Sequence, residues 1–229
     1  MSERESILAR IREALSVQAP FPGAHDQFAP HHTAAPKTPA EIRHWLPQVG
    51  SSFEERLELF RKRAGELKLD FHLVDNRDQL AGLLLSLRDT EEWKKVGTHS
   101  ADLTDFATVK LGLPICRTDG GYEVTELESC SVGFTECDAL VAQTGSVLVT
   151  SRTAGGRALS VLPPHHVVLA RREQLLGDLP EAFALLKKRY AADFPSFISF
   201  ITGPSRTGDI ERILVLGAHG PKKLTILCL

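Results

Sequence analysis

The sequence predicts an α/β protein with a mostly parallel sheet that is covered by helices on both faces. In the first half of the chain, three segments have apolar residues at helical spacing, and a short apolar run suited to a strand follows each. Such alternation is typical of parallel sheets built from strand–helix–strand units. The helical segments are 53–67, 80–87 and 101–111, and the strand segments are 71–74, 93–96 and 113–116.

Local signals support several of these elements. Ser52 and Glu55 have the spacing of a capping box in front of the first helix. Asp75 or Asn76 is expected to cap the second helix.

The second half of the chain adds further strands and one long helix. Two apolar runs, 139–142 and 146–150, flank Gln143-Thr144-Gly145 and predict a hairpin. Further strands are expected at 167–170, 197–201 and 224–229, the last of which closes the sheet, and a helix is expected at 172–190.

The N-terminal region differs from the rest in composition. Apolar residues at helical spacing predict a helix within residues 1–17, whereas five prolines fall within 18–39 and predict an extended linker. We therefore expect an N-terminal helical arm at 1–17, a proline-rich linker at 18–39 and a single α/β domain at 40–229.

Composition limits the partners and cofactors. A net charge of -2 gives no electrostatic reason to expect nucleic acid or an anionic membrane as a partner. No apolar run approaches the roughly 18 residues that span a bilayer, and the charged N-terminus has no secretory signal pattern, which favours the cytoplasm. Four scattered cysteines provide no iron–sulfur or metal motif in this chain. The chain also has no dinucleotide fingerprint, P-loop or HExxH motif.

The richest polar motif runs from Gly203 to Glu211 and is followed by His219. If Ser205 or Thr207 caps a helix, backbone N–H groups would face a ligand. Arg206 would bind a carboxylate or phosphate in a bidentate manner, with Asp209 beside it. Alternatively, Ser205, Thr207 and Asp209 only cap and charge the helix.

Other segments offer further candidate residues. Thr144, Gly145 and Ser146 form either a ligand-facing turn or an ordinary hairpin turn. Arg157 follows two glycines, in a loop that either closes over a ligand or is simply solvated. His165 or His219 would act as a general base toward a hydroxy acid, or has a structural role.

Three blocks of sequence give the chain a resemblance to a known family. They are 133–146 (with Gly133-Phe134-Thr135 and Ala142-Gln143-Thr144-Gly145-Ser146), Leu162-Pro163-Pro164-His165-His166-Val167, and 203–221 (from Gly203-Pro204-Ser205-Arg206 to Ala218-His219-Gly220-Pro221). In these blocks the chain resembles the lactate-utilisation protein C family, whose members contain a LUD domain.

The resemblance implies a Rossmann-like fold of the NagB/RpiA/CoA-transferase group. It also implies a role in bacterial oxidation of L-lactate to pyruvate beside two partner proteins with iron–sulfur motifs. Because CoA-transferase-type enzymes use a glutamate nucleophile, Glu136 becomes a candidate catalytic residue, although nothing in its local sequence marks it as one.

We therefore expect a subunit of a lactate-oxidising complex that binds a small carboxylate or a phosphate-bearing ligand. Two alternatives stay open at this point. One is a stand-alone acyl- or CoA-transferase-like or sugar-phosphate isomerase-like enzyme, and the other is a non-catalytic assembly or regulatory protein.

Overall fold

The computed structural model describes residues 3–16, 47–208, 214–216 and 220–229. The chain divides into two compact units, Met1–Trp45 and Leu46–Leu229. The first unit contains helix α1 (Glu3–Ser16). The linker expected at 18–39 lies outside the described residues.

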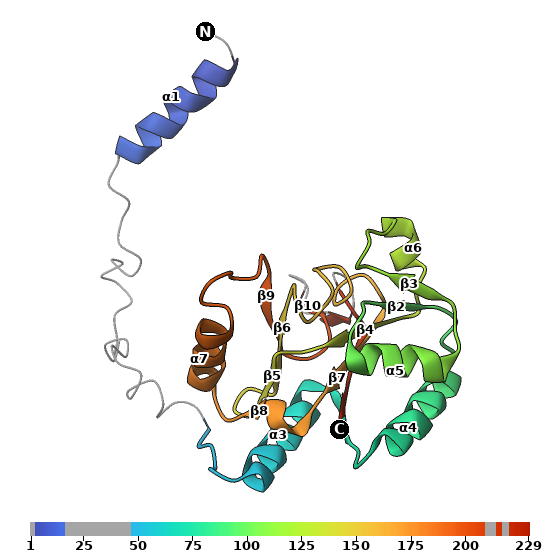
Figure 1. Cartoon of the computed structure of the whole chain (residues 1–229). Helices are drawn as coiled ribbons and strands as arrows, with labels where there is room; N and C mark the ends of the chain where they lie inside the picture. Colours follow the sequence, from blue (N-terminus) through green and yellow to red (C-terminus); the bar gives the residue numbers. More distant parts are fainter. Residues whose placement is uncertain (1–2, 17–46, 209–213, 217–219) are drawn as a thin grey trace. The chain divides into compact units, whose positions relative to one another are not determined.

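A six-stranded parallel sheet forms the centre of the second unit (Figure 1). Its order is β1-β12-β7-β4-β2-β3, and every neighbouring pair is parallel. The prediction of a mostly parallel α/β fold is therefore confirmed. The strands are β1 (Asp70–Leu73), β2 (Val96–Thr98), β3 (Ile115–Arg117), β4 (Val132–Glu136), β7 (His165–Ala170) and β12 (Lys223–Cys228).

Helices α4 (Arg77–Thr90) and α5 (Asp102–Leu111) cover one face of this sheet. Strand β7 is buried on both faces, and its residues alternate between two cores: Val167 and Leu169 belong to the core of α4 and α5, whereas Val168 and Ala170 belong to the opposite core. Such burial on both faces is characteristic of parallel sheets.

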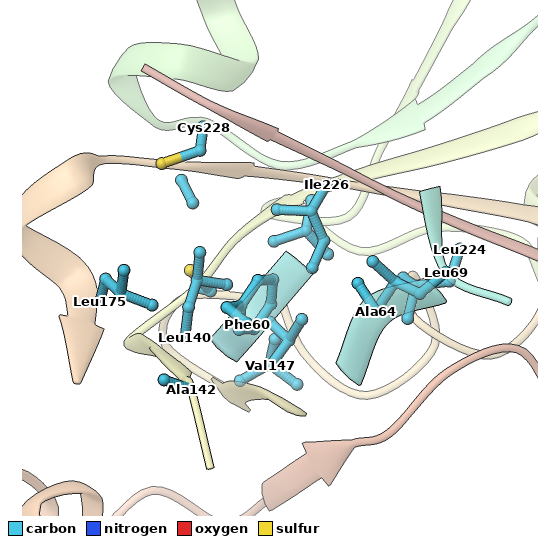
Figure 2. Close-up of a cluster of buried hydrophobic side chains, with 14 of the residues drawn as sticks. Phe60, Ala64, Leu69, Leu140, Ala142, Val147, Leu175, Leu224, Ile226 and Cys228 are labelled. Atoms are coloured by element: carbon cyan, nitrogen blue, oxygen red, sulfur yellow. The ribbon is translucent and has the colours of Figure 1, made fainter. Parts of the chain in front are cut away.

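The opposite face packs against helix α3 (Phe53–Leu67) and against a second sheet. Figure 2 shows Phe60 of α3 among side chains from both sheets, including Leu140, Val147 and Ile226. Phe60 is completely buried, and its ring packs edge to face against Phe71 with the two ring centroids 5.1 Å apart. This core fixes the second sheet on the first.

The second sheet was not predicted as a separate layer. Its order is β8-β5-β6-β9, and helix α7 packs on its outer face. The hairpin of β5 and β6 is confirmed, with Gly145 at a positive φ of 65° in the turn. The elements are β5 (Ala139–Val141), β6 (Ser146–Thr150), β8 (Leu175–Leu176), β9 (Ile198–Ile201) and α7 (Leu179–Arg189).

The single helix expected at 172–190 is wrong in its first part. A 3-10 turn, η1 (Arg172–Gln174), is followed by β8, which pairs with β5. Helix α7 begins only after Asp178, whose side chain caps it by accepting from Glu181 N at 2.9 Å. Pro180 in the first turn suits this start because its missing N–H has no helical partner there.

Three further expectations need revision. The strand expected at 93–96 begins only at Val96. The last strand lies inside the six-stranded sheet, between β1 and β7. The helix expected after Gly203 is instead β10 (Arg206–Gly208), paired with β11 (Leu214–Leu216).

The helix caps agree with the sequence signals. The capping box of Ser52 and Glu55 is present, and Asn76 caps α4 by accepting from Gln79 N at 2.9 Å. A short helix, α6 (Val124–Glu128), lies beyond β3. None of the described helices combines the length and apolar character that crossing a membrane requires.

Candidate functional site

The sheet order places a topological switch point between β2 and β4. From β2 the chain continues to β3 on one side, whereas from β4 it continues to β7 and β12 on the other. In open parallel sheets, ligands bind at the carboxyl ends of the strands beside such a point. The residues at these ends therefore define the candidate site.

Glu136 and His99 lie at these two strand ends. Glu136 is the last residue of β4, and His99 directly follows β2. The backbone N–H of Glu136 points to His99 Nε2 at 3.4 Å, and Glu136 Oε1 accepts from Leu103 N of α5 at 2.7 Å. The carboxylate is thus held at the positive end of a helix.

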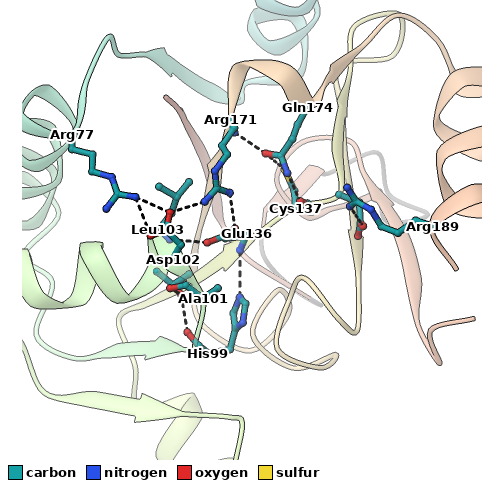
Figure 3. A network of polar contacts seen from close by, with 12 residues as sticks. Arg77, His99, Ala101, Asp102, Leu103, Glu136, Cys137, Arg171, Gln174 and Arg189 are labelled. Atoms are coloured by element: carbon teal, nitrogen blue, oxygen red, sulfur yellow. Dashed lines mark hydrogen bonds and ion pairs between the residues drawn. The ribbon is translucent and has the colours of Figure 1, made fainter. Parts of the chain in front are cut away.

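Arg171 follows β7 and joins two carboxylates. Figure 3 shows its guanidinium between Glu136, which it contacts at 2.9 Å, and Asp102, which it contacts at 2.8 Å. Arg77 of α4 binds Asp102 from the other side at 2.7 Å. Hydrogen bonds from Arg77 and Arg171 lower the pKa of Asp102. Two cations and two anions therefore form a balanced network that spans the ends of four elements, α4, α5, β4 and β7.

His99 is a buried imidazole within this network, only 4% exposed. Burial lowers its pKa, while Asp119, Glu136 and Asp105 oppose that change. The ring is therefore neutral at pH 7, with one nitrogen able to accept a proton or a hydrogen bond.

A loop after β6 covers His99. Gly155 adopts a positive φ of 58°, and a Cβ at this position would lie 2.3 Å from the Cβ of His99. Its carbonyl accepts from Thr118 Oγ1 at 2.8 Å. Only glycine can bring the backbone this close to the imidazole.

The predicted base His165 is not brought to this edge. It is the first residue of β7, at the amino end of the sheet, whereas Glu136 and Arg171 lie at the carboxyl end. Its Nε2 lies 2.9 Å from Thr225 Oγ1, and burial lowers its pKa to about 4. Its neighbour His166 bonds Thr135 at 2.8 Å, and burial lowers its pKa to about 3. The contacts of both histidines are structural.

The predicted turn at Thr144–Ser146 meets the end of β9. Ser146 Oγ lies 2.8 Å from both Thr144 Oγ1 and Thr202 Oγ1. Gly145 packs so closely on α3 that a Cβ would lie 2.7 Å from Arg63 Cβ. This turn lies at the start of β6, whereas the loop over His99 follows the end of the same strand. The two groups therefore do not form one site.

The Gly203 motif packs against the C-terminal end of α3. Arg206 donates to the carbonyl of Leu67 in the last turn of that helix. A cation is favourable at a helix C-terminus, where free carbonyls carry negative partial charge. Ser205 N donates to Pro221 O at 2.9 Å. Ser205 and Arg206 are thus engaged within the fold, but not as the cap of a helix, because the segment after Ser205 is the strand β10.

The remaining predicted residues lie elsewhere or are not described. Arg157 is exposed and donates to Ser196 O at 2.7 Å. The side chain of Thr207, and all of Asp209 and His219, lie outside the described residues.

Sequence reasoning named Glu136 as a candidate but did not name the residues that contact it here, His99, Asp102 and Arg171. Each lies just beyond a predicted strand or at the start of a predicted helix, where polar residues are common. A signal for these residues exists only in the strand order, because β2, β4 and β7 become neighbours through long connections.

A cavity of about 560 Å³ lies at the other edge of the sheet. It is formed by the C-terminal ends of α4 and α5 and by the segment before β2, and its lining includes Arg88, Trp93 and Leu111. Arg88 is occupied there by Asp89 and by the carbonyl of Leu111. The cavity includes none of the residues of the network at Glu136.

The cysteines are buried and free. Burial raises the pKa of Cys130 and of Cys228 to about 11. In the described part of the chain, no group of three or more His, Cys, Asp or Glu side chains is arranged to hold a metal ion.

Comparison with known proteins relates the C-terminal part of the chain to a known family. Residues 124–229 match the family model of the LUD domain. This match covers slightly less than half of the chain. The chain is 34% identical over 110 residues to lactate utilization protein C of Anoxybacillus flavithermus, a match that spans 48% of this chain and 49% of that protein.

Other relatives match over more of their length. Lactate utilization protein C of Halalkalibacterium halodurans is 26% identical over 96% of this chain and 95% of its own. The crystal structure of a DUF162 family protein from Deinococcus radiodurans has a TM-score of 0.61, with 20% identity over 78% of this chain and 99% of that one. At this identity the likeness concerns the fold.

Proposed function

We propose that this protein acts in lactate utilisation and binds a small carboxylate at the carboxyl edge of its parallel sheet. Relatives named lactate utilization protein C support the process. The observation that carries the site is the position of Arg171 between Glu136 and Asp102, beside His99, at the switch point of the sheet.

The charges favour a monoanion as the ligand. Arg171 and Arg77 already balance Glu136 and Asp102, so a phosphate dianion would leave more uncompensated charge than a monocarboxylate. Asp102 is the most exposed acid of the network, at 56%. A ligand carboxylate would displace it and take its bonds to the two arginines.

A hydroxy acid also fits the rest of the site. With its carboxylate on Arg171, the hydroxyl of lactate would lie toward the centre of the network. Neutral His99 would accept the hydroxyl proton at Nε2 once the covering loop admits the ligand and the lactate hydroxyl replaces the Glu136 N–H at that nitrogen. Oxidation to pyruvate also transfers the hydrogen on C2 with its two electrons, as a hydride, to an acceptor outside this chain. In this proposal, partner subunits with iron–sulfur motifs, which the family resemblance implies, take the electrons from that acceptor.

Isothermal titration with L-lactate tests the site, with pyruvate, acetate and phosphate as competitors at constant ionic strength. Arg171→Gln removes a charged hydrogen-bond donor worth about 1.5–3 kcal/mol, which corresponds to about 10- to 100-fold weaker binding. Arg88→Gln is the matched control because Arg88 is equally exposed and also paired, but lies at the other edge of the sheet. Equal affinity of Arg171→Gln and the unmutated protein would refute the site.

A second candidate function rests on the position of Glu136. In an acyl- or CoA-transferase, its carboxylate oxygen would attack the thioester carbonyl, the C–S bond would break, and CoA thiolate would leave. The side chain is 13% exposed, and both of its oxygens already accept hydrogen bonds. Incubation with acetyl-CoA and mass spectrometry of the Glu136 peptide tests this chemistry, with Glu136→Gln as control.

The assembly role and the isomerase role make different predictions. An assembly protein would retain its iron–sulfur partners in a pull-down of the Arg171→Gln variant and would bind no lactate. An isomerase would convert a sugar phosphate without partners.

A further inference from the structure

We propose that Asp138 is a positioning residue for His99, which it holds in place through Thr153 and the loop that covers the imidazole. The site is the one assigned above, and only the consequence for lactate binding rests on the proposed function.

Asp138 is a completely buried carboxylate between β4 and β5. One oxygen, Oδ1, accepts from Arg189 Nη1 and from Tyr190 Oη, each at 2.7 Å. The other, Oδ2, accepts from Thr153 Oγ1 at 2.8 Å. Such a carboxylate is costly to bury unless its bonds are made, so the network strongly favours a single arrangement of these groups.

Thr153 connects this carboxylate to the loop over His99. Its Oγ1 accepts from Thr150 N at 3.0 Å, and its own N–H donates to Thr150 O at 3.2 Å. Gly155, two residues further along the same loop, lies against His99: a Cβ at Gly155 would be 2.3 Å from His99 Cβ. Thr153 therefore ties Asp138 to the loop that covers His99.

One contact selects the form of the ring. His99 Nε2 faces the N–H of Glu136 and accepts from it at 3.4 Å, so the other ring nitrogen carries the proton of the neutral imidazole. This contact holds the tautomer and the orientation of the ring as long as the covering loop keeps the ring in place.

Three acidic side chains from different elements act on the imidazole of His99. Glu136 ends β4, Asp105 lies on α5, and Asp119 follows β3. All three acids favour a protonated ring, while burial disfavours it. The loop held by Asp138 supplies part of this burial. Releasing the loop therefore exposes the imidazole and raises the pKa of His99.

Nuclear magnetic resonance of the imidazole nitrogens tests the proposal on the whole chain without any ligand. Thr153→Val removes the hydroxyl with little change of shape and releases the loop from Asp138. We expect His99 to lose its single tautomer and its pKa to rise toward the ordinary value. Thr153→Ser, which keeps the hydroxyl, restores the original spectrum. Tyr190→Phe removes one of three bonds to Asp138 and has a smaller effect.

A control in the same spectrum separates a local effect from general loosening. Thr225→Val removes the hydroxyl that bonds His165, so it shifts the His165 signals and leaves His99 unchanged. The proposal is overturned if folded Thr153→Val keeps the tautomer and pKa of His99, or if Thr225→Val changes His99 equally. Because no ligand takes part, a failure of lactate binding leaves this result standing.

Discussion

Replacing Gly155 by alanine tests the closeness of the covering loop to His99. The new Cβ would lie 2.3 Å from His99 Cβ, 2.7 Å from His99 Cγ and 2.8 Å from Thr118 Oγ1. Because the nearest atom is attached directly to the backbone, a rotation of the histidine ring cannot relieve the overlap. The loop has to move away instead.

The expected cost has two parts. Alanine at a positive φ of 58° costs about 1–2 kcal/mol wherever it occurs. Movement of the loop also breaks the bond from Thr118 to the Gly155 carbonyl and strains the bond from Thr153 to Asp138, which adds about 2–3 kcal/mol. We therefore expect a loss of about 3–5 kcal/mol in the free energy of unfolding.

Gly112→Ala is the matched control. Gly112 ends α5 with a φ of 62°, and a Cβ there would meet nothing within 4 Å. The Gly112→Ala variant therefore has only the cost of a positive φ, about 1–2 kcal/mol. In a domain of this size each kcal/mol lowers the melting temperature by about 2–4 °C. Thermal unfolding followed by circular dichroism measures both variants, and equal melting temperatures would refute the close contact.

Three further predictions concern the core and the titrating groups. His165 has a pKa of about 4 in the folded state, below its value of about 6.5 in the unfolded chain. Its contribution to the free energy of unfolding is therefore fully present above pH 6.5 and is lost as the pH falls toward 4. Urea unfolding at several pH values measures this dependence, which His165→Gln reduces. Phe60→Ala, at a completely buried position, costs about 3–5 kcal/mol in denaturant unfolding, whereas the 58% exposed Phe183 tolerates the same change with a small effect; equal costs would contradict the assigned core. Cys130, whose pKa burial raises to about 11, reacts with iodoacetamide at pH 7.5 only as fast as the protein opens, and rapid labelling of the native state would show that the thiol is accessible.

The sequence predicted the elements better than their arrangement. Helices α3, α4 and α5 each present an apolar face that local spacing shows, and the hairpin of β5 and β6 has a turn that short-range chemistry selects. The split of the strands into two sheets depends on pairing between distant segments. Leu175 and Leu176 fit the apolar face of a helix, yet they pair with β5 as a strand.

The candidate site shows the same division. Glu136 became a candidate only because the fold group implied by the resemblance includes enzymes with a glutamate nucleophile, and not through any signal in its local sequence. His99, Asp102 and Arg171 lie in three separate segments, and only the order β7-β4-β2 places their strand ends together. Arg206 illustrates the reverse case. Its turn-rich surroundings look like a ligand loop, but its guanidinium is taken by the end of α3, a helix nearly 140 residues earlier in the chain.

The position of β12 has a consequence for how the protein is made on the ribosome. This strand lies between β1 and β7 and pairs residue 225 with residue 70. Until residues 223–228 leave the exit tunnel, β1 has no neighbour in the sheet and the edge of β7 is open to any extended chain. The sheet therefore stays incomplete during synthesis, and pairing of such long range slows folding and leaves strand edges exposed to aggregation in the meantime.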